Sequence, residues 1–487
     1  MISTMGKYQY GTLVRTPLRT SRVFIVAMMC SLAGLAAGVE TDSSAPPPGW
    51  LTQPISLLDA VRIALERNGD ILKSQQDLSA SYGIAMQTRA ILIPKVRGSA
   101  SYEHNEAVED TSRTSTGSGT NGLLNTPEDQ WRGSIRIVQS VYEGGRMRSA
   151  FRSARLTKEQ AYLEYQTVVA NTVLDVRTAY YDVLLAQEQI TVQAASVKLL
   201  EGELGKTKQR FDAGAVPRFN VLRAEVKIAN ARPRLIRAYN NYRTAKNQLA
   251  TVLGYNLPAE VSEDIPLTLT TKFTIEPLDM ALPSALARAR ERRPELGALR
   301  AEVALRKESV VIAKAGSKPS LGIFAGYNSH SSEFREGFYD DVSGPLAGVA
   351  MTWDIFDGRA TQGRVVEARA RQAKASINLE DQMRRIEQEV RTAYSKFIEA
   401  REVIESQKRV VEQAEEAVRL ADSRYEAGSG TQLDVLDAET SLTEARSTAV
   451  EAARDYQVSR ARLERAIGLD VTQEVNPTRQ DREIKQP

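Results

Sequence analysis

RYEAGSGTQLDVLDAETSLTEAR, residues 424–446, reads as the end of one helix, a glycine turn and the start of a second helix that carries two aspartates. Residues 210–232, RFDAGAVPRFNVLRAEVKIANAR, repeat this stretch 214 positions earlier, and nine of the 23 positions are identical. A chain that contains the same helical hairpin twice is built as two halves with one plan. The sequence therefore predicts a two-fold internal repeat.

A long heptad pattern precedes each hairpin tip. Apolar residues alternate by three and four from Tyr162 to Leu204, and the same thirteen positions, shifted by 214, run from Ser376 to Val418. Eleven of the thirteen are apolar in each half. This spacing predicts coiled-coil helices of about 60 residues, which span about 90 Å at 1.5 Å per residue.

Alternating patterns follow a proline in each half. Pro94 and Pro319 end helical patterns, because proline lacks the amide donor that a helix needs. Each half then has two runs of alternating apolar and polar residues, which predict four strands at about 95–105, 131–142, 319–328 and 345–356. One apolar face opposite a small or polar face fits an outer-membrane strand or an amphipathic hairpin on a soluble core, and the strands alone favour neither.

The order of these patterns gives the domain boundaries. A basic region that ends at Arg22 and an apolar run over 23–38 predict a secretory signal peptide, since the run is short for a transmembrane anchor. The predicted segments are the signal peptide 1–38, a first repeat 39–254 with its tip near 214, an equatorial linker 255–281, a second repeat 282–470 with its tip near 428, and a polar tail 471–487.

The composition excludes several classes of function. Beyond residue 38 the chain has 60 basic and 61 acidic residues, a balance that argues against nucleic-acid binding. The single cysteine, Cys30, lies in the apolar run, so the predicted mature chain has no disulfide and no thiol chemistry. No other run of 18 apolar residues exists, so the mature chain could enter a membrane only as strands.

The duplicated plan, the turns YEGGR (142–146) and FDGR (356–359) and the run DVLDAETSLTEAR resemble the TolC family of outer-membrane efflux and type I secretion channels. The resemblance implies a mostly α fold with a small β part. It implies a long antiparallel coiled-coil α-barrel and a 12-stranded outer-membrane β-barrel, formed by a homotrimer with four strands per chain. Four strands leave two open edges, and lipid cannot form hydrogen bonds with the unpaired backbone groups there. The residues themselves therefore predict several copies of the chain. The number three comes from the resemblance.

The resemblance also implies a location and partners. The protein would lie in the cell outer membrane and span into the periplasm. It would passively export small molecules, drugs or secreted proteins, which an inner-membrane transporter delivers through a periplasmic adaptor (membrane fusion) protein. No assembled catalytic set and no GxxxxGK[ST] phosphate loop are present, so we expect neither an enzyme nor a cofactor. The alternative is a soluble periplasmic coiled-coil adaptor or scaffold protein.

Asp434 and Asp437 are the main candidate site residues. Their i, i+3 spacing places both on one side of a helix start, where the helix dipole favours acids for purely structural reasons. In the resembled family the matching positions line a periplasmic constriction. There, three copies would crowd six carboxylates into a gate ring that attracts cations. The first tip has Asn220 and Arg223 instead, so the ring is expected on the second tip.

The resemblance assigns further roles at the tips. Tyr425 matches a latch tyrosine, Asn220 stands where an aspartate partner is frequent, and Gly430 replaces an arginine, which leaves Arg218 as a substitute latch. Gly214 and Gly428 permit left-handed helix ends, and the family implies that adaptor hairpins dock there.

Two further features of the sequence, a motif match and the two histidines, are expected to form no binding site. A literal GxGxxG match over 117–122 lies in a Ser/Thr-rich loop between strands, whereas a dinucleotide site needs a strand followed by a helix. His104 and His330, the only histidines, each follow a first strand. Solvated loop residues are the favoured interpretation for both, ahead of a metal site.

Overall fold

The structure is a computed structural model that describes residues 51, 53–104, 129–257, 264–271, 273–275, 278–331 and 341–469. These residues fall within one compact unit, Gly49–Pro487. The predicted signal peptide with Cys30, the polar tail and the GxGxxG match lie outside the described residues. Among those described, no helix has the apolar stretch that crossing a membrane requires.

The helices confirm the two-fold repeat. Corresponding helices in the two halves have equal lengths of 11, 21, 67 and 35 residues. The first half contains α2 (Leu57–Arg67), α3 (Gly69–Arg89), α4 (Arg146–Asp212) and α5 (Arg218–Val252). The second contains α6 (Leu282–Arg292), α7 (Pro294–Lys314), α8 (Ala360–Glu426) and α9 (Gln432–Ala466).

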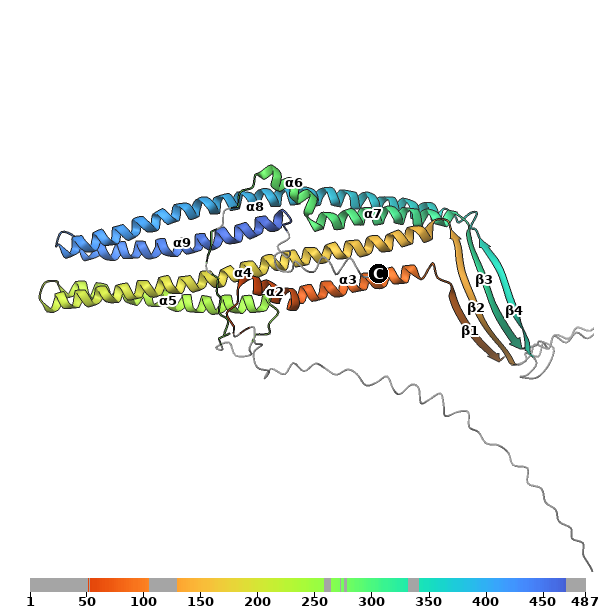
Figure 1. Cartoon of the computed structure of the whole chain (residues 1–487), viewed down its shortest axis with the longest axis horizontal. Coiled ribbons are helices and arrows are strands. Elements are labelled where there is room, and N and C mark those ends of the chain that lie inside the picture. Colours follow the sequence, from red (N-terminus) through yellow and green to blue (C-terminus); the bar gives the residue numbers. More distant parts are fainter. Residues whose placement is uncertain are drawn as a thin grey trace, which may run out of the picture. The chain divides into compact units, whose positions relative to one another are not determined.

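The heptad positions explain the unusual length of α4 and α8. In α8 all thirteen positions are buried or half-buried, and in α4 only Tyr162 is exposed. The helices that return from the tips pack on these long helices, α5 on α4 and α9 on α8 (Figure 1). At 1.5 Å per residue, a helix of 67 residues spans about 100 Å.

The four strands form one antiparallel sheet in the order β1-β2-β3-β4 (Figure 1). The strands are β1 (Lys95–His104), β2 (Asp129–Glu143), β3 (Ser320–Ser331) and β4 (Asp341–Thr352). The two halves meet at the β2–β3 pair, in which Ile135 lies opposite Tyr327. The outer strands β1 and β4 therefore each have one edge without a partner among the described residues.

The fourth strand differs from its expected range. Alternation in the sequence predicts a strand to residue 356, but β4 ends at Thr352. Its partner β3 begins at Ser320, opposite Thr352, so the residues after Thr352 have no strand to pair with. Trp353 instead donates its indole N–H to the Ser317 carbonyl oxygen at 3.3 Å. The helices before Pro94 and Pro319 also end a few residues earlier than expected, at Arg89 and Lys314.

The helices lie beside one another in a fixed order. Helix α4 packs against α3, α5, α7 and α9, and α8 packs against α6, α7 and α9. The sequence of contacts is therefore α3–α4–α7–α8 toward the sheet and α5–α4–α9–α8 toward the tips (Figure 1). The free sides of this layer belong to α3 and α5 at one edge and to α8 at the other.

The linker between the halves contributes to the core. Ile265 and Leu267 are buried with α2, α4 and the end of α5. The backbone of Ile55 pairs with this segment, and the Tyr180 hydroxyl donates to the Ile55 carbonyl oxygen at 3.0 Å. This packing ties the linker to the middle of α4.

Equivalent positions make equivalent contacts in the two halves. The Asn68 amide donates to the Val252 carbonyl oxygen at the end of α5 (2.8 Å), and the Arg293 guanidinium donates to the Ala466 carbonyl oxygen at the end of α9 (3.2 Å). Gly254 follows α5 with a φ of 79°. A Cβ there would lie 2.4 Å from the Arg67 carbonyl oxygen, so only glycine fits.

Candidate functional site at the hairpin tips

The two tips have the same backbone geometry. Gly214 and Gly428 both have a φ of 74°. The following amides donate back to the helix end, Ala215 to the Arg210 carbonyl oxygen (2.8 Å) and Ser429 to that of Arg424 (2.9 Å). These are left-handed glycine caps of the kind that ends many helices. The space around each glycine is open, since an added Cβ would meet no atom within 4 Å.

Asp434 caps its own helix. Thr431 is the N-cap of α9, its hydroxyl accepts from the Asp434 amide, and the Asp434 carboxylate accepts from the Thr431 amide (2.9 Å) and hydroxyl (2.8 Å). These hydrogen bonds hold the pKa of Asp434 below its usual value. The carboxylate is therefore ionised and positioned, and it has a structural role within one chain.

Asp437 lies one turn further along α9 and has a different contact. Its carboxylate lies 3.6 Å from the Lys227 ammonium of α5, and its side chain is 63% exposed. The structure thus places the two predicted aspartates on one stretch of helix but gives them separate partners. Whether three copies gather them into a ring stays a prediction.

Tyr425, Asn220 and Arg218 are not joined to one another within the chain. The guanidinium of Arg210 lies over the Tyr425 ring, 4.3 Å from its centroid. The Tyr425 hydroxyl is buried and has no hydrogen-bond partner among the residues that the structure describes. The side chains of Asn220 and Arg218 make no hydrogen bond or ion pair to the described chain. A latch between these residues therefore stays a prediction.

A buried polar cluster beneath the second tip was not foreseen from the sequence. Gln432 donates to the Thr207 hydroxyl (2.8 Å), which in turn donates to the Glu203 carboxylate (3.3 Å). Glu439 lies two turns beyond Gln432 on α9. All four side chains are buried, and one oxygen each of Gln432 and Glu439 has no partner in the described chain.

Burial raises the pKa of Glu439 to about 7, and the neighbouring carboxylates of Glu203 and Asp422 raise it as well. Burial also raises the pKa of Glu203. No sequence signal marks this cluster, because α4 and α9 meet only through the tertiary fold and the partners lie 225 residues apart.

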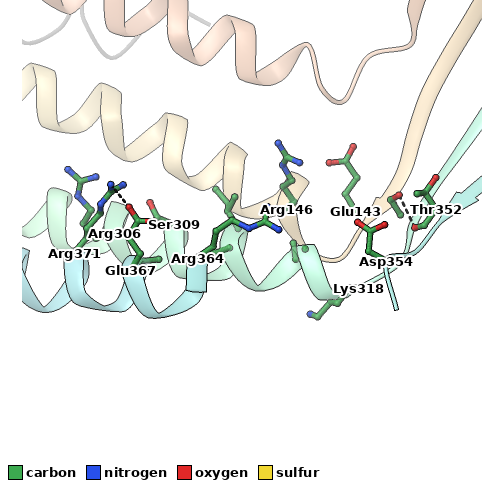
Figure 2. A pocket seen from close by; sticks show the side chains of 16 residues that line it. Glu143, Arg146, Arg306, Ser309, Lys318, Thr352, Asp354, Arg364, Glu367 and Arg371 are labelled. Atoms are coloured by element: carbon green, nitrogen blue, oxygen red, sulfur yellow. Dashed lines mark hydrogen bonds and ion pairs between the residues drawn. The ribbon is translucent and has the colours of Figure 1, made fainter. Parts of the chain in front are cut away.

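A second polar region lies where the strands join the long helices (Figure 2). This pocket of about 640 Å³ is lined by charged side chains from β2, α4, α7 and α8. Most of its cations have acidic partners: Arg371 pairs with Glu367 at 2.5 Å, and Arg306 pairs with Glu302 at 3.3 Å. Three of the five cations that line the pocket, Arg306, Arg364 and Arg371, therefore have an acid within ion-pair distance.

The two histidines do not meet. His104 pairs with Asp129 across β1 and β2, whereas His330 pairs with Arg132 across β2 and β3. The strand alternation places them on opposite faces of the sheet. Within the described part of the chain, no group of three or more His, Cys, Asp or Glu is arranged to hold a metal.

The protein has a small sheet with one exposed apolar face, and two long helical hairpins of the same plan extend from it. This arrangement defines the class of outer-membrane channel-tunnel protomers. The family model described as outer membrane efflux protein matches residues 60–255 and 285–469. The chain therefore belongs to the outer membrane efflux protein family, and it is an outer-membrane protein.

Curated relatives span almost the whole chain. The outer membrane protein TolC of Escherichia coli is 24% identical over 431 residues, which cover 86% of this chain and 83% of TolC. The alkaline protease secretion protein AprF of Pseudomonas aeruginosa is 24% identical over 84% of this chain and 83% of its own length. The names of these relatives refer to the outer membrane and to secretion.

Solved structures share the fold. The CmeC outer membrane channel of Campylobacter jejuni superposes with a TM-score of 0.72 at 16% identity, and the match covers 86% of this chain and 88% of CmeC. The fold class, the family and the outer-membrane location predicted from the sequence are thereby confirmed.

Proposed function

We propose that three copies of this chain assemble into a passive export channel, which an inner-membrane transporter supplies through a periplasmic adaptor. The free edges of the sheet are the observation that carries this proposal. β1 and β4 each leave a row of backbone amides and carbonyls unpaired in the described chain. Such groups cannot face lipid, and three copies with four strands each would close a barrel of twelve.

The edges of the helical layer support the same assembly. Exposed large apolar side chains lie on the helices that form the free sides, α3, α5 and α8, and four more lie on the central helix α4, while α7 has none and α9 only Leu433. They include Tyr82 and Met86 on α3, Val226, Ile236 and Tyr239 on α5, and Val366, Ile377 and Leu420 on α8. Burial of such residues in a partner stabilises an assembly by about 25 cal/mol per Å².

One face of the sheet is suited to lipid. Val96, Tyr102, Ile135, Ile323 and Met351 lie on this face, and all are exposed in the single chain. Aromatic and apolar residues continue just past the sheet, where Trp353 and Ile355 are 50% and 83% exposed. An apolar belt with an aromatic rim is typical of outer-membrane strands.

The energy source and the cargo must then come from partners. The sequence lacks a nucleotide-binding phosphate loop, so a separate transporter has to energise export. One relative is named for secretion of an alkaline protease, another for pyoverdine export and a third for cobalt-zinc-cadmium resistance. We propose efflux or type I secretion for this chain, with the adaptor docking at the tips around Gly214 and Gly428.

A soluble periplasmic adaptor or scaffold is the second candidate. The coiled coils alone would suit it. An exposed apolar sheet face of this kind argues against a soluble protein, because it would promote aggregation in water.

Cell fractionation combined with conductance measurement tests the proposal. We expect the mature chain in the outer-membrane fraction as a trimer that heat converts to monomer in denaturing gels. We also expect the purified trimer to conduct ions in a planar bilayer. A monomer in the periplasmic fraction with no conductance would favour the soluble alternative.

A further inference from the structure

Three cations gather on the polar face of the sheet, close to its helical end. Arg97 of β1 and Arg136 of β2 are direct cross-strand partners. Lys95 precedes Arg97 by two residues and therefore lies on the same face of the sheet. The polar face is identified by Ser99 and Ser134, whose hydroxyls are hydrogen-bonded at 2.8 Å. We call Lys95, Arg97 and Arg136 the cationic collar.

No acid lies beside the collar. Its same-face neighbours include Ser99, Ser134, Val138 and Gly326. The acids of this face, Glu103 and Glu143, lie at opposite ends of the sheet, six or seven residues from the two arginines and therefore about 20 Å away at 3.3 Å per residue. The three collar side chains make no ion pair or hydrogen bond to the described residues.

The chain makes room for the collar. A Cβ at Gly326 of β3 would lie 2.3 Å from the Ile135 carbonyl oxygen and 3.0 Å from Cγ of Arg136. The Arg136 side chain therefore lies over the glycine, on the polar face. Like charges placed directly opposite one another destabilise a strand pair. The arrangement thus costs stability and brings no internal contact in return.

The collar differs from the charged pocket beside it. In that pocket Arg306, Arg364 and Arg371 each lie within ion-pair distance of an acid, and Lys318 donates to a carbonyl oxygen. Among the cations that line the pocket, Arg146 alone has no ion pair or hydrogen bond to the described residues. The collar leaves three cations that only solvent or a solute can neutralise.

We propose that the collar binds anions in the strand section of the channel, and that the exported substrates are solutes with two or more negative charges. This inference rests on the proposed trimeric channel, in which the polar face lines the water-filled interior. Three copies would then bring their collars into one ring. Low-dielectric walls around a narrow aqueous path concentrate such a field and attract counter-ions.

The collar lies where the strands join the long helices, a whole long helix away from the tips. The second tip carries Asp434 and Asp437, which favour cations, so two sections of one conduit would differ in sign. A polyvalent anion should therefore act on the strand section and a divalent cation on the tips. The two effects can be measured separately.

Block of single-channel current by citrate, added to each chamber in turn, tests the inference. We expect the Arg97→Gln/Arg136→Gln variant to need about ten times more citrate for half-block than the wild type, because two charges per chain are lost. The matched control, Arg97→Lys/Arg136→Lys, keeps both charges and should keep the block. Equal half-block concentrations in the wild type and the Gln variant would overturn the inference while leaving the channel intact.

The wild type provides a second measurement that needs no variant. Salt screens charges, and the Debye length falls from about 10 Å at 0.1 M to about 3 Å at 1 M. Citrate block should therefore weaken strongly between these KCl concentrations. Block that does not change with salt would contradict the collar. A trimer that conducts no current at all would overturn the proposed function itself, and this inference with it.

Discussion

Asn68 and Arg293 occupy equivalent positions in the two halves and cap equivalent helix ends with different chemistry. Each donates to the last carbonyls of a returning helix, α5 or α9. Arg293 does more, since its buried guanidinium also pairs with Glu295 at 3.0 Å and with Glu389 at 2.9 Å. The second half thus depends on a buried charge where the first half uses a neutral amide.

Substitution of Arg293 tests this dependence. We expect Arg293→Met to lower the free energy of unfolding by about 2 kcal/mol, because it removes charged hydrogen bonds to Glu295 and Glu389, which then keep only Arg465 as an ion-pair partner. Arg290→Met is the control, since Arg290 makes an exposed ion pair with Glu387 and its loss should cost less than about 1 kcal/mol. Thermal unfolding followed by circular dichroism measures both, and equal effects would contradict the assignment.

Glycines with similar backbone angles have different surroundings. Gly254→Ala should destabilise the protein by about 3 kcal/mol, because the new Cβ meets the Arg67 carbonyl oxygen in addition to the left-handed strain. Gly428→Ala should cost only about 1–2 kcal/mol, since nothing lies near it. The melting temperatures of the two variants should differ clearly, and the reverse order would contradict this account.

At the scale of elements, the contact between α4 and α9 combines apolar packing with a buried polar cluster. Leu200 and Leu436 pack together there, and Glu203 and Glu439 lie close by. The surrounding charges are Lys206 on α4, Lys227 and Asp437 on α5 and α9, and Asp422 on α8. The contact that joins the two hairpins therefore depends on the protonation of buried acids.

Stability of this contact should depend on pH. The pKa of Glu439 rises from 4.5 to about 7 in the folded protein, so the folded state holds a proton that the unfolded state releases. Stability is then highest below pH 4.5 for this group and falls as the pH rises toward 7, by about 3 kcal/mol in total.

The Glu439→Gln variant isolates this effect. It should be more stable than the wild type at pH 8 and similar to it at pH 5, because the amide carries no charge at either pH. Glu444→Gln, an exposed site on the same helix, should change neither value. Melting temperatures at the two pH values provide the measurement. A Glu439→Gln variant that is no more stable at pH 8 would contradict a charged Glu439 in the folded state.

Local pattern predicted most elements, and tertiary context decided the rest. Heptads and the repeat locate the helices and tips, because burial of one helical face leaves a mark in the sequence. The end predicted for β4 was wrong, because the alternation of apolar and polar residues continues through Ile355 while strand pairing stops where β3 begins. The Glu203–Glu439 cluster could not be foreseen, because it depends on how two helices that are far apart in the sequence pack against each other.

At the scale of the whole molecule, the tips would form the narrow end of the channel. The structure refines the choice of residue for a test, since Asp434 caps α9 and its removal would also disturb the helix start. Asp437 has no capping role and is 63% exposed. It is the better probe of a cation-attracting ring.

Asp437→Asn should weaken the cation preference of single channels and their block by divalent cations, while Asp434 and the helix cap stay intact. Glu444→Gln is the depth control, because Glu444 lies seven residues further along α9 and so about 10 Å from the ring. Reversal potentials in a KCl gradient measure the preference. Identical reversal potentials for Asp437→Asn and the wild type would contradict the gate ring.

The central claim is that the free edges of the sheet close between three copies. The predicted mature chain has no cysteine, so engineered disulfides can report this directly. Ser99→Cys in β1 would be combined in turn with Leu346→Cys, Gly348→Cys, Ala350→Cys or Thr352→Cys in β4, which lie on the same polar face, since the register between copies is set only in the assembly. We predict that at least one pair gives dimers and trimers on non-reducing gels, with nothing larger, and that single-cysteine variants give neither. Only monomers for all four pairs, or a ladder that continues past the trimer, would contradict the claim.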